Sequence, residues 1–396
     1  MWAFVLSGAL LADLQPLSPL FLAFLFAGIG AHIAGMWAHR KIAGRRGHVQ
    51  PLPEDILDAR LLRRARAVGT ALFVLVVLGV LFFLNAYLEV VPSLDTLGLL
   101  QARGAYLEEV RGTRDKLFIY TTHLTLFGIA ALHFSARLCA TIRRRGLSVP
   151  IHRFNLLALS VFVAGVLTTG RTAPLLVIIC YGYYALRFGL YSKTRIVVSF
   201  FGLSVSMFVL IAFALGKEGL GDGVSGDALD ALANLGRVYF FSAPAALQEV
   251  VLRGEIVSTV CSNIFAYPID LAKKFGAFAH CDAQELDFVF VPVATNVYTL
   301  LRAYWTDFGL AYIPALFVSG MLIDAVFTGA NARAAFMSFL YPFVLNSLLL
   351  QVFEEQLFAN GSVLLYAIAF YFTLSVVFFP SARRRFHPFS PIANTA

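Results

Sequence analysis

The stretch AVGTALFVLVVLGVLFFLNAYLEV at 67–90 carries one charged side chain, Glu89, in 24 residues. As an α-helix it is about 36 Å long at 1.5 Å per residue, and the hydrocarbon core of a bilayer is about 30 Å thick. This stretch therefore predicts a helix that crosses a membrane.

The rest of the 396-residue chain has a similar composition, with 59% hydrophobic and 14% charged residues. Soluble domains average about 45–50% and about 25%, so a water-soluble enzyme, a coiled coil and a disulfide-rich secreted domain are excluded. Apolar runs recur at 17–37, 67–90, 117–138, 154–169, 172–190, 196–216, 307–329, 334–351 and 361–379. They predict an all-α polytopic membrane protein with about nine transmembrane helices in a single integral membrane domain, residues 1–396.

Residues 1–12 are apolar but too short to span, and predict a partial or re-entrant outer segment, or the remnant of a first span if the chain starts upstream.

The distribution of charge predicts which side each loop faces. With the C-terminus and its Arg383–Arg385 run in the cytoplasm, the inner loops hold 20 of the 31 Lys and Arg, and the outer side holds 19 of the 23 Asp and Glu. This follows the positive-inside rule, so the net charge of +8 is a topology signal and not a nucleic-acid footprint. The two long outer loops are 91–116 and 217–306. Ninety residues without structure would be unusual, so we expect helices in the second loop, including an amphipathic one over 227–239.

Two polar clusters lie at outer ends of the predicted spans. The first is the turn TTGRTAP at 168–174, where Gly170 permits close approach of a ligand and Arg171 stands on the side that the charge rule disfavours. The second is RVYFFSAP at 237–244, where Arg237 suits a phosphate and Tyr239 suits a sugar or a lipid. Each has a plain alternative: Arg171 as a helix-end arginine that reaches water, and the second cluster as an interfacial aromatic belt.

The third cluster is the most informative. Its polar residues are Thr295, Asn296, Tyr298, Arg302, Tyr304 and Asp307. A helix that starts near Pro292 would place Thr295, Tyr298 and Arg302 on one face, and such a hydroxyl-rich cationic face does not suit packing against lipid. Asp307 fits two roles that do not exclude each other, the N-terminal cap of the seventh span and a catalytic carboxylate.

The other polar residues give weaker indications of function. No spacing of His, Cys, Asp or Glu suits a metal ion, so we expect no metal and no cofactor. Cys261 and Cys281 share the long outer loop, where either a disulfide or two free thiols is possible, whereas Cys139 and Cys180 lie in spans as small buried residues. Asp324 follows Asp307 by about 25 Å along a helix, so we place it near the cytoplasmic face, away from an outer site.

The three clusters, in this order from about Gly170 to Gly309, resemble the Wzy-type oligosaccharide repeat-unit polymerases, which act as O-antigen polymerases in bacterial inner membranes. The resemblance implies a C-type glycosyltransferase fold and a periplasmic reaction on polyprenyl-pyrophosphate-linked glycans, with a chain-length regulator as a possible partner. It implies that Arg171, Arg237 and Arg302 hold pyrophosphate. The tyrosines of the second and third clusters would line the sugar path, and Asp307 is the first candidate for a general base.

Two other functions are compatible with the sequence. An O-antigen ligase uses similar lipid-linked donors, but the outer histidine motif expected of that class is not evident, because His280 stands in an unremarkable stretch. A transporter or flippase of lipid-linked glycan would favour paired halves and ionisable residues at mid-membrane, and Asp324 alone makes a poor relay.

Overall fold

The computed structural model describes most of the predicted spans and parts of the long outer loop. The described residues are 16–43, 59–90, 117–168, 172–194, 198, 202, 242–253, 263–273, 275–276, 289–291, 294–295, 298–331, 335–351, 357 and 361–378. The first outer loop at 91–116, the predicted amphipathic helix at 227–239, Cys261 and Cys281 lie outside them.

Eight of the nine predicted spans coincide with a helix. These helices are α2 (Pro19–Ala43), α3 (Ala59–Val90), α5 (Leu117–Arg144), α6 (Ile151–Leu167), α7 (Thr172–Arg187), α13 (Tyr312–Asn331), α14 (Ala335–Leu350) and α15 (Gly361–Phe378). Five stretches are long and apolar enough to cross a membrane, namely Pro19–Ala43, Leu62–Glu89, Tyr120–Arg144, Leu300–Asn331 and Gly361–Phe378. The chain is therefore a helical, multi-pass membrane protein. The remaining predicted span, 196–216, lies almost wholly outside the described residues.

The contacts divide the chain into two compact units. Unit 1 comprises residues 1–53, 93–101 and 201–364, and unit 2 comprises residues 54–92, 102–200 and 365–396. The single domain that the sequence predicts stays a prediction, since each unit is described by itself.

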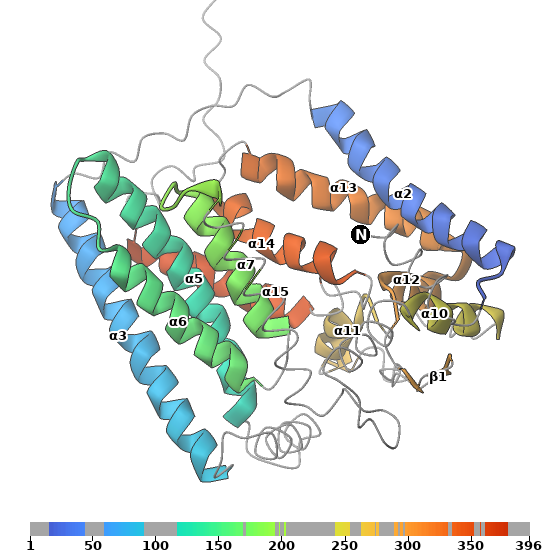
Figure 1. The fold of residues 1–396 in the computed structure, drawn as a ribbon, viewed down its shortest axis with the longest axis horizontal. Helices are drawn as coiled ribbons and strands as arrows, with labels where there is room; N and C mark the ends of the chain where they lie inside the picture. The colour runs from blue at the N-terminus through green and yellow to red at the C-terminus, as the bar shows by residue number, and fades with distance from the viewer. Residues whose placement is uncertain are drawn as a thin grey trace, which may run out of the picture. The chain divides into compact units, whose positions relative to one another are not determined.

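Unit 2 is built around α5. This helix is largely buried by α3, α6 and α7, whereas α3 is largely exposed along its length, as a lipid-facing helix would be. A Cβ on Gly128 of α5 would lie 2.5 Å from a methyl of Val161 on α6, so the two helices pack closely there. Figure 1 shows α3, α5, α6 and α7 running side by side. Cys139 on α5 and Cys180 on α7 are buried in this bundle, as predicted.

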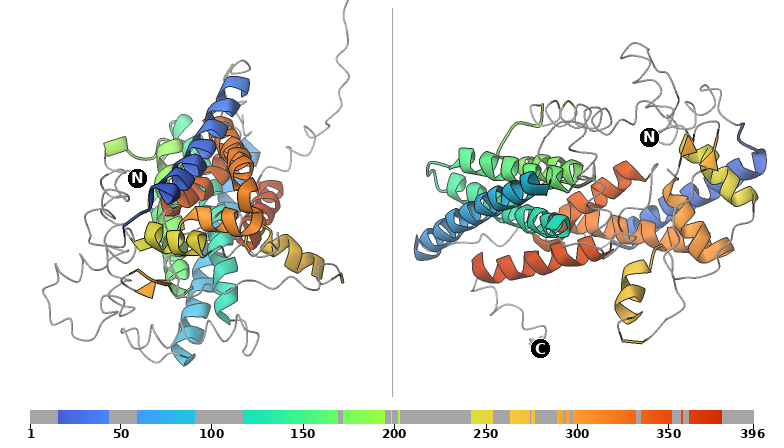
Figure 2. Two further views of the ribbon diagram at one scale, coloured as in Figure 1. Left: turned by 90° about the vertical axis from the view of Figure 1, so that its right-hand side faces the viewer. Right: turned by 90° about the horizontal axis from the view of Figure 1, so that it is seen from below.

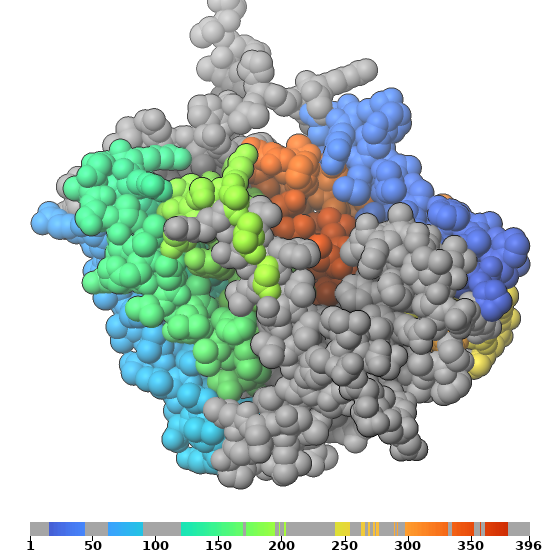
Figure 3. All heavy atoms as spheres, in the orientation of Figure 1, coloured from blue at the N-terminus to red at the C-terminus, as the bar shows by residue number. Residues whose placement is uncertain are grey.

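Unit 1 is organised by the packing of α2 against α13, which lie side by side in both views of Figure 2. At Gly35 a Cβ would clash with the backbone carbonyl of Phe317, and at Gly320 it would clash with the carbonyl of His32. Only glycine lets the two backbones approach this closely, a common solution for packed membrane helices. Figure 3 shows the side chains of α2 in blue directly beside those of α13 in orange.

Asp324 ties the same two helices together. Its carboxylate is fully buried. One oxygen accepts a hydrogen bond from Arg40 Nε at 2.7 Å, and the other lies 2.9 Å from Nδ1 of His39; both residues are at the end of α2. An acid inside an apolar helix needs such partners, because an unpaired buried charge is costly. The basic end of α2 therefore lies at the Asp324 end of α13, and the inner placement that the sequence predicts for these residues stays a prediction.

The long outer loop does carry helices of its own, as predicted. They are α10 (Ser242–Leu252), α11 (Ala266–Lys273) and α12 (Leu300–Phe308), and a two-residue antiparallel pair joins β1 (Val289–Phe290) to β2 (Ala294–Thr295). The helix that the sequence starts near Pro292 begins instead at Leu300. Thr295 pairs with Val289 in the strand ladder, and the Thr299 side chain caps the helix by accepting from the Leu301 N–H.

Candidate functional site

The third polar cluster of the sequence centres on α12, whose two ends are fixed by specific contacts. At its start the Leu300 N–H donates to the carbonyl of Gln351, 2.8 Å away. At its end Gly309 has φ +53°, a conformation that favours glycine, and its N–H donates to the carbonyl of Trp305. The short 3₁₀ turn η2 (Gly309–Ala311) then leads into α13, so the predicted seventh span is preceded by a separate buried helix.

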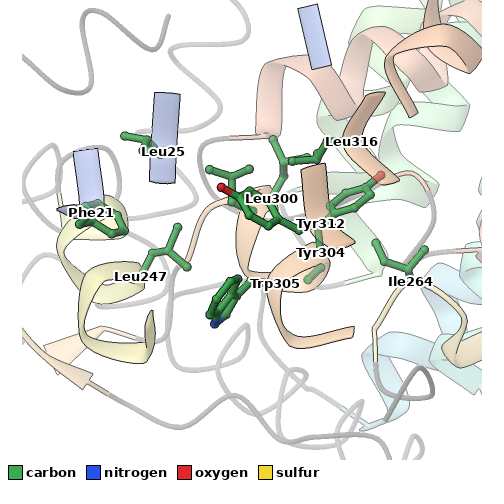
Figure 4. Close-up of a cluster of buried hydrophobic side chains, with 11 residues drawn as sticks. Phe21, Leu25, Leu247, Ile264, Leu300, Tyr304, Trp305, Tyr312 and Leu316 are labelled. Carbon is green, nitrogen blue, oxygen red and sulfur yellow. The ribbon is translucent and has the colours of Figure 1, made fainter. Parts of the chain in front are cut away.

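The apolar side chains of α12 anchor it in unit 1. Leu301, Tyr304 and Trp305 pack in one buried cluster with Phe21 and Leu25 of α2, and with residues of α10 and α13 (Figure 4). Each of these five side chains is less than a tenth exposed. Because helices in a membrane associate through close van der Waals packing, this cluster fixes the position of α12 and therefore of its polar residues.

Arg302 is a buried cation held against an aromatic ring. Only 7% of the residue is exposed, and its guanidinium carbon lies 4.3 Å from the centre of the Tyr298 ring. Tyr298 packs in turn against Ala245 and Val250 of α10 and against β1. A guanidinium at this distance from a ring gains about 0.5–2 kcal/mol, and more as water is excluded. The arrangement holds a fork of five N–H donors in a largely dry setting, which suits phosphate oxygens.

Asp307 holds the turn that precedes α11. One carboxylate oxygen accepts from the Ile264 N–H at 2.6 Å and from the Asn263 N–H at 3.3 Å, and the other accepts from the Asn263 side-chain amide at 2.9 Å. The same amide donates to the Thr306 hydroxyl at 2.8 Å. Asp307 is 3% exposed and lies in the last turn of α12, so it does not cap the seventh span as one interpretation of the sequence supposed. Its oxygens are engaged by donors from another segment.

Arg302 and Asp307 are displayed in different directions. Five residues of α-helix turn a side chain by about 140° at 3.6 residues per turn, so the two side chains leave α12 on different sides. Arg302 faces Tyr298, and Asp307 faces the turn before α11. The cation and the carboxylate of the predicted site are thus on one helix but are supported by different neighbours.

The other predicted site residues fall into two groups. Tyr304 is described and lies in the apolar cluster at 2% exposure, and Thr295 is described as part of β2. The remaining residues, namely Gly170, Arg171, Arg237, Tyr239 and Asn296, lie outside the described residues, and their roles stay predictions.

Sequence reasoning missed two side chains that support this region. Gln248 of α10 is 2% exposed, accepts from the Ser18 N–H at 2.6 Å and donates to the Pro16 carbonyl at 3.0 Å, which fixes the approach to α2. Asn263 joins the turn before α11 to Thr306 and Asp307, about 43 residues away. A lone amide in a loop gives no local signal of such a distant partner.

Among the described residues, no three His, Cys, Asp or Glu side chains lie close enough together to hold a metal ion. The expectation that no metal is needed stays a prediction for an activity assay. Comparison of the chain with protein-family models, with curated proteins and with solved structures finds no match.

Proposed function

We propose that this protein is a membrane glycosyltransferase of the oligosaccharide repeat-unit polymerase type, which joins polyprenyl-pyrophosphate-linked oligosaccharides on the outer side of a bacterial inner membrane. The observation that carries the proposal is the buried Arg302 guanidinium stacked on Tyr298, on a short helix beside a membrane-spanning helix. The order of the Gly170–Arg171 turn, the Arg237–Tyr239 segment and the third cluster along the chain supports it further.

The chemistry of the proposed reaction explains why buried arginines would matter. A sugar hydroxyl of the acceptor attacks the anomeric carbon of the donor, the bond from that carbon to the pyrophosphate oxygen breaks, and the hydroxyl loses its proton. Negative charge grows on the departing pyrophosphate. A guanidinium already held in place stabilises that charge in the transition state without reorganising, which lowers the barrier directly.

In this proposal Arg302 is the described member of a cationic site, and Arg171 and Arg237 are its expected companions. Tyr298 keeps the Arg302 guanidinium in one orientation. Asp307 remains a candidate for the base that takes the hydroxyl proton. The three N–H donors on its carboxylate favour a second role, in which it positions the turn before α11 and acts on the reaction through that turn.

The test is a gel ladder of surface polysaccharide from a strain that lacks the gene and carries plasmid copies of wild type or Arg302→Ala. Arg253→Ala is the matched control, because Arg253 lies in the same long loop, is more than half exposed and pairs only with its helix neighbour Glu249 among the contacts described. We expect the wild type and the control to restore long chains, and Arg302→Ala at equal protein level to leave a single repeat.

Other results would separate the remaining functions. Loss of every repeat from the acceptor in the strain without the gene would indicate ligase or transport activity. A wild-type ladder with Arg302→Ala would remove the proposed cationic site.

A further inference from the structure

Exposed arginines gather at one end of unit 2. Arg63, Arg64 and Arg66 lie at the start of α3, Arg144 and Arg145 at the end of α5, and Arg153 at the start of α6, and all six are exposed. Figure 1 shows that these helix ends lie at the same end of the bundle, and Figure 3 shows side chains of α3, α5 and α6 at its surface.

Two hydrogen bonds show that these helix ends are neighbours. The Arg153 Nη1 donates to the Thr70 hydroxyl at 3.0 Å, which joins α6 to α3. The Arg143 Nη1 donates to the Gly189 carbonyl, which joins the end of α5 to the turn after α7. Two arginines therefore link the helices, and Arg63, Arg64, Arg66 and Arg144 at the same end are exposed.

The charge at this end has no counter-charge among the described residues of unit 2. Their only acid is Glu89, which lies about 35 Å from Arg66 along α3. A surface of one sign raises the local concentration of anions and holds them more tightly than isolated charges do. Guanidinium groups suit phosphate in particular, since their planar forks match its oxygens.

An exposed apolar surface follows the arginines along α3 and α6. On α3, Val74, Leu75 and Leu78 are 46%, 55% and 58% exposed, two to four turns after the cationic residues. On α6, Leu156 and Leu159 are 48% and 57% exposed, within two turns of Arg153. Cations next to an exposed apolar strip match a molecule with a phosphate head and hydrocarbon chains.

We propose that the basic end of unit 2, defined by the six exposed arginines above, binds the phosphate groups of anionic phospholipids in the adjoining leaflet. The acyl chains lie along the exposed apolar surface of α3 and α6. A headgroup with two phosphates engages more arginines at once than a headgroup with one, so diphosphatidylglycerol binds more tightly than phosphatidylglycerol. This inference does not depend on the proposed glycosyltransferase activity.

The test measures lipid binding to the purified full chain in neutral detergent by native mass spectrometry, with diphosphatidylglycerol and phosphatidylcholine as probes. The variant is Arg64→Gln with Arg144→Gln, because neither side chain has a described contact that would disturb folding. The matched control, Arg253→Gln with Lys273→Gln, removes the same two charges from unit 1. Each basic residue at an anionic surface contributes about a fivefold factor in affinity, so we expect roughly thirty-fold weaker binding of diphosphatidylglycerol by the variant alone.

A second double variant, Arg63→Gln with Arg66→Gln, tests the same surface if the first one folds poorly. Equal binding by the folded variants and the control would overturn the proposal. Equal binding of phosphatidylcholine would overturn it as well, since that lipid carries no net charge. Displacement of the lipid by glycerol phosphate at the same concentration would show that a free phosphate suffices, and would refute the assignment to a lipid.

Discussion

Replacement of Asp307 by alanine should open the turn before α11. The substitution removes a carboxylate that accepts three hydrogen bonds. Their donors are the Ile264 N–H at 2.6 Å, the Asn263 side-chain amide at 2.9 Å and, more weakly, the Asn263 N–H at 3.3 Å. A buried donor left without an acceptor costs about 1–3 kcal/mol, and Ile264 is only 7% exposed. The two short bonds together give an expected loss of about 3–5 kcal/mol in the local stability of this turn.

Hydrogen exchange of the turn, measured by mass spectrometry in detergent, reports this loss directly. A loss of 3 kcal/mol corresponds to exchange about 150-fold faster for the Ile264 amide, since each 1.4 kcal/mol is a factor of ten. Asn263→Ala should give a smaller acceleration, because it leaves the Ile264 N–H bonded to Asp307. The double variant should be less destabilised than the sum, as expected for residues in one network. Unchanged exchange in Asp307→Ala would refute the reasoning.

The same variants separate the two roles of Asp307. If the carboxylate only positions the turn, Asn263→Ala and Thr306→Val should lower polymer length in step with the faster exchange. If it is the general base, Asp307→Asn should abolish polymer while exchange of the turn changes little, and Asn263→Ala should keep activity. General base catalysis is worth about 10²–10⁴ in rate, so the two outcomes are well separated.

Four further perturbations test other features of the protein. Gly320→Val should lower the thermal midpoint of the detergent-solubilised chain sharply, because a Cβ there meets the backbone of α2, and an unchanged midpoint would contradict the close crossing. Asp324→Ala should cost about 1.5–3 kcal/mol in SDS unfolding, since it removes the charged acceptor of the Arg40 Nε–H while the exposed Arg40 side chain can turn to solvent, and Asp324→Asn should cost less. Tyr298→Leu should shorten the polymer more than Tyr298→Phe, because phenylalanine keeps the ring that faces Arg302; equal effects would exclude the stacking role. Activity should survive EDTA, and recovery only on adding Mg²⁺ or Mn²⁺ would show that a metal is needed.

The sequence predicted most of the helices because their signal is local. A run of apolar residues about 20 long is sufficient to indicate a span, and eight such runs are helices whose ends lie within eight residues of the predicted ends. The start of α12 was wrong for a local reason as well. Pro292 suggested a first turn, but the Thr299 hydroxyl provides the cap, and a strand pair occupies Ala294 and Thr295.

The support of the candidate site was beyond sequence reasoning because it depends on distant residues. The sequence singled out Arg302, Tyr298 and Asp307 by residue type and spacing, and the structure describes all three as buried. It gave no sign that Asp307 bonds Asn263 or that Gln248 holds the approach to α2. These pairings form only when the loop folds back on α12. The spacing of residues within one segment of the sequence does not indicate such a fold.

The contacts between α2 and α13 connect the sidedness of the membrane with that of the site. Phe24 accepts from the Tyr312 hydroxyl near one end, Gly35 meets Phe317 further along, and His39 and Arg40 reach Asp324 near the other end, so the two helices run parallel. Parallel directions agree with the predicted topology, in which the first and seventh spans both run inward. If the positive-inside rule places the basic end of α2 in the cytoplasm, the opposite end of the pair, which continues into α12, must lie at the outer face.

The sidedness of α12 therefore follows from one pair of helices and does not require the number of spans between them. Turning α13 over would break the Asp324 contacts and would separate Phe24 from Tyr312. An acid in an apolar helix needs a basic partner at the same depth in the membrane. Asp324 therefore stays beside the basic end of α2 in any arrangement that preserves this packing. With the basic end of α2 inside, as the positive-inside rule predicts, Arg302 would lie at the outer face, where the proposed reaction would join lipid-linked glycans.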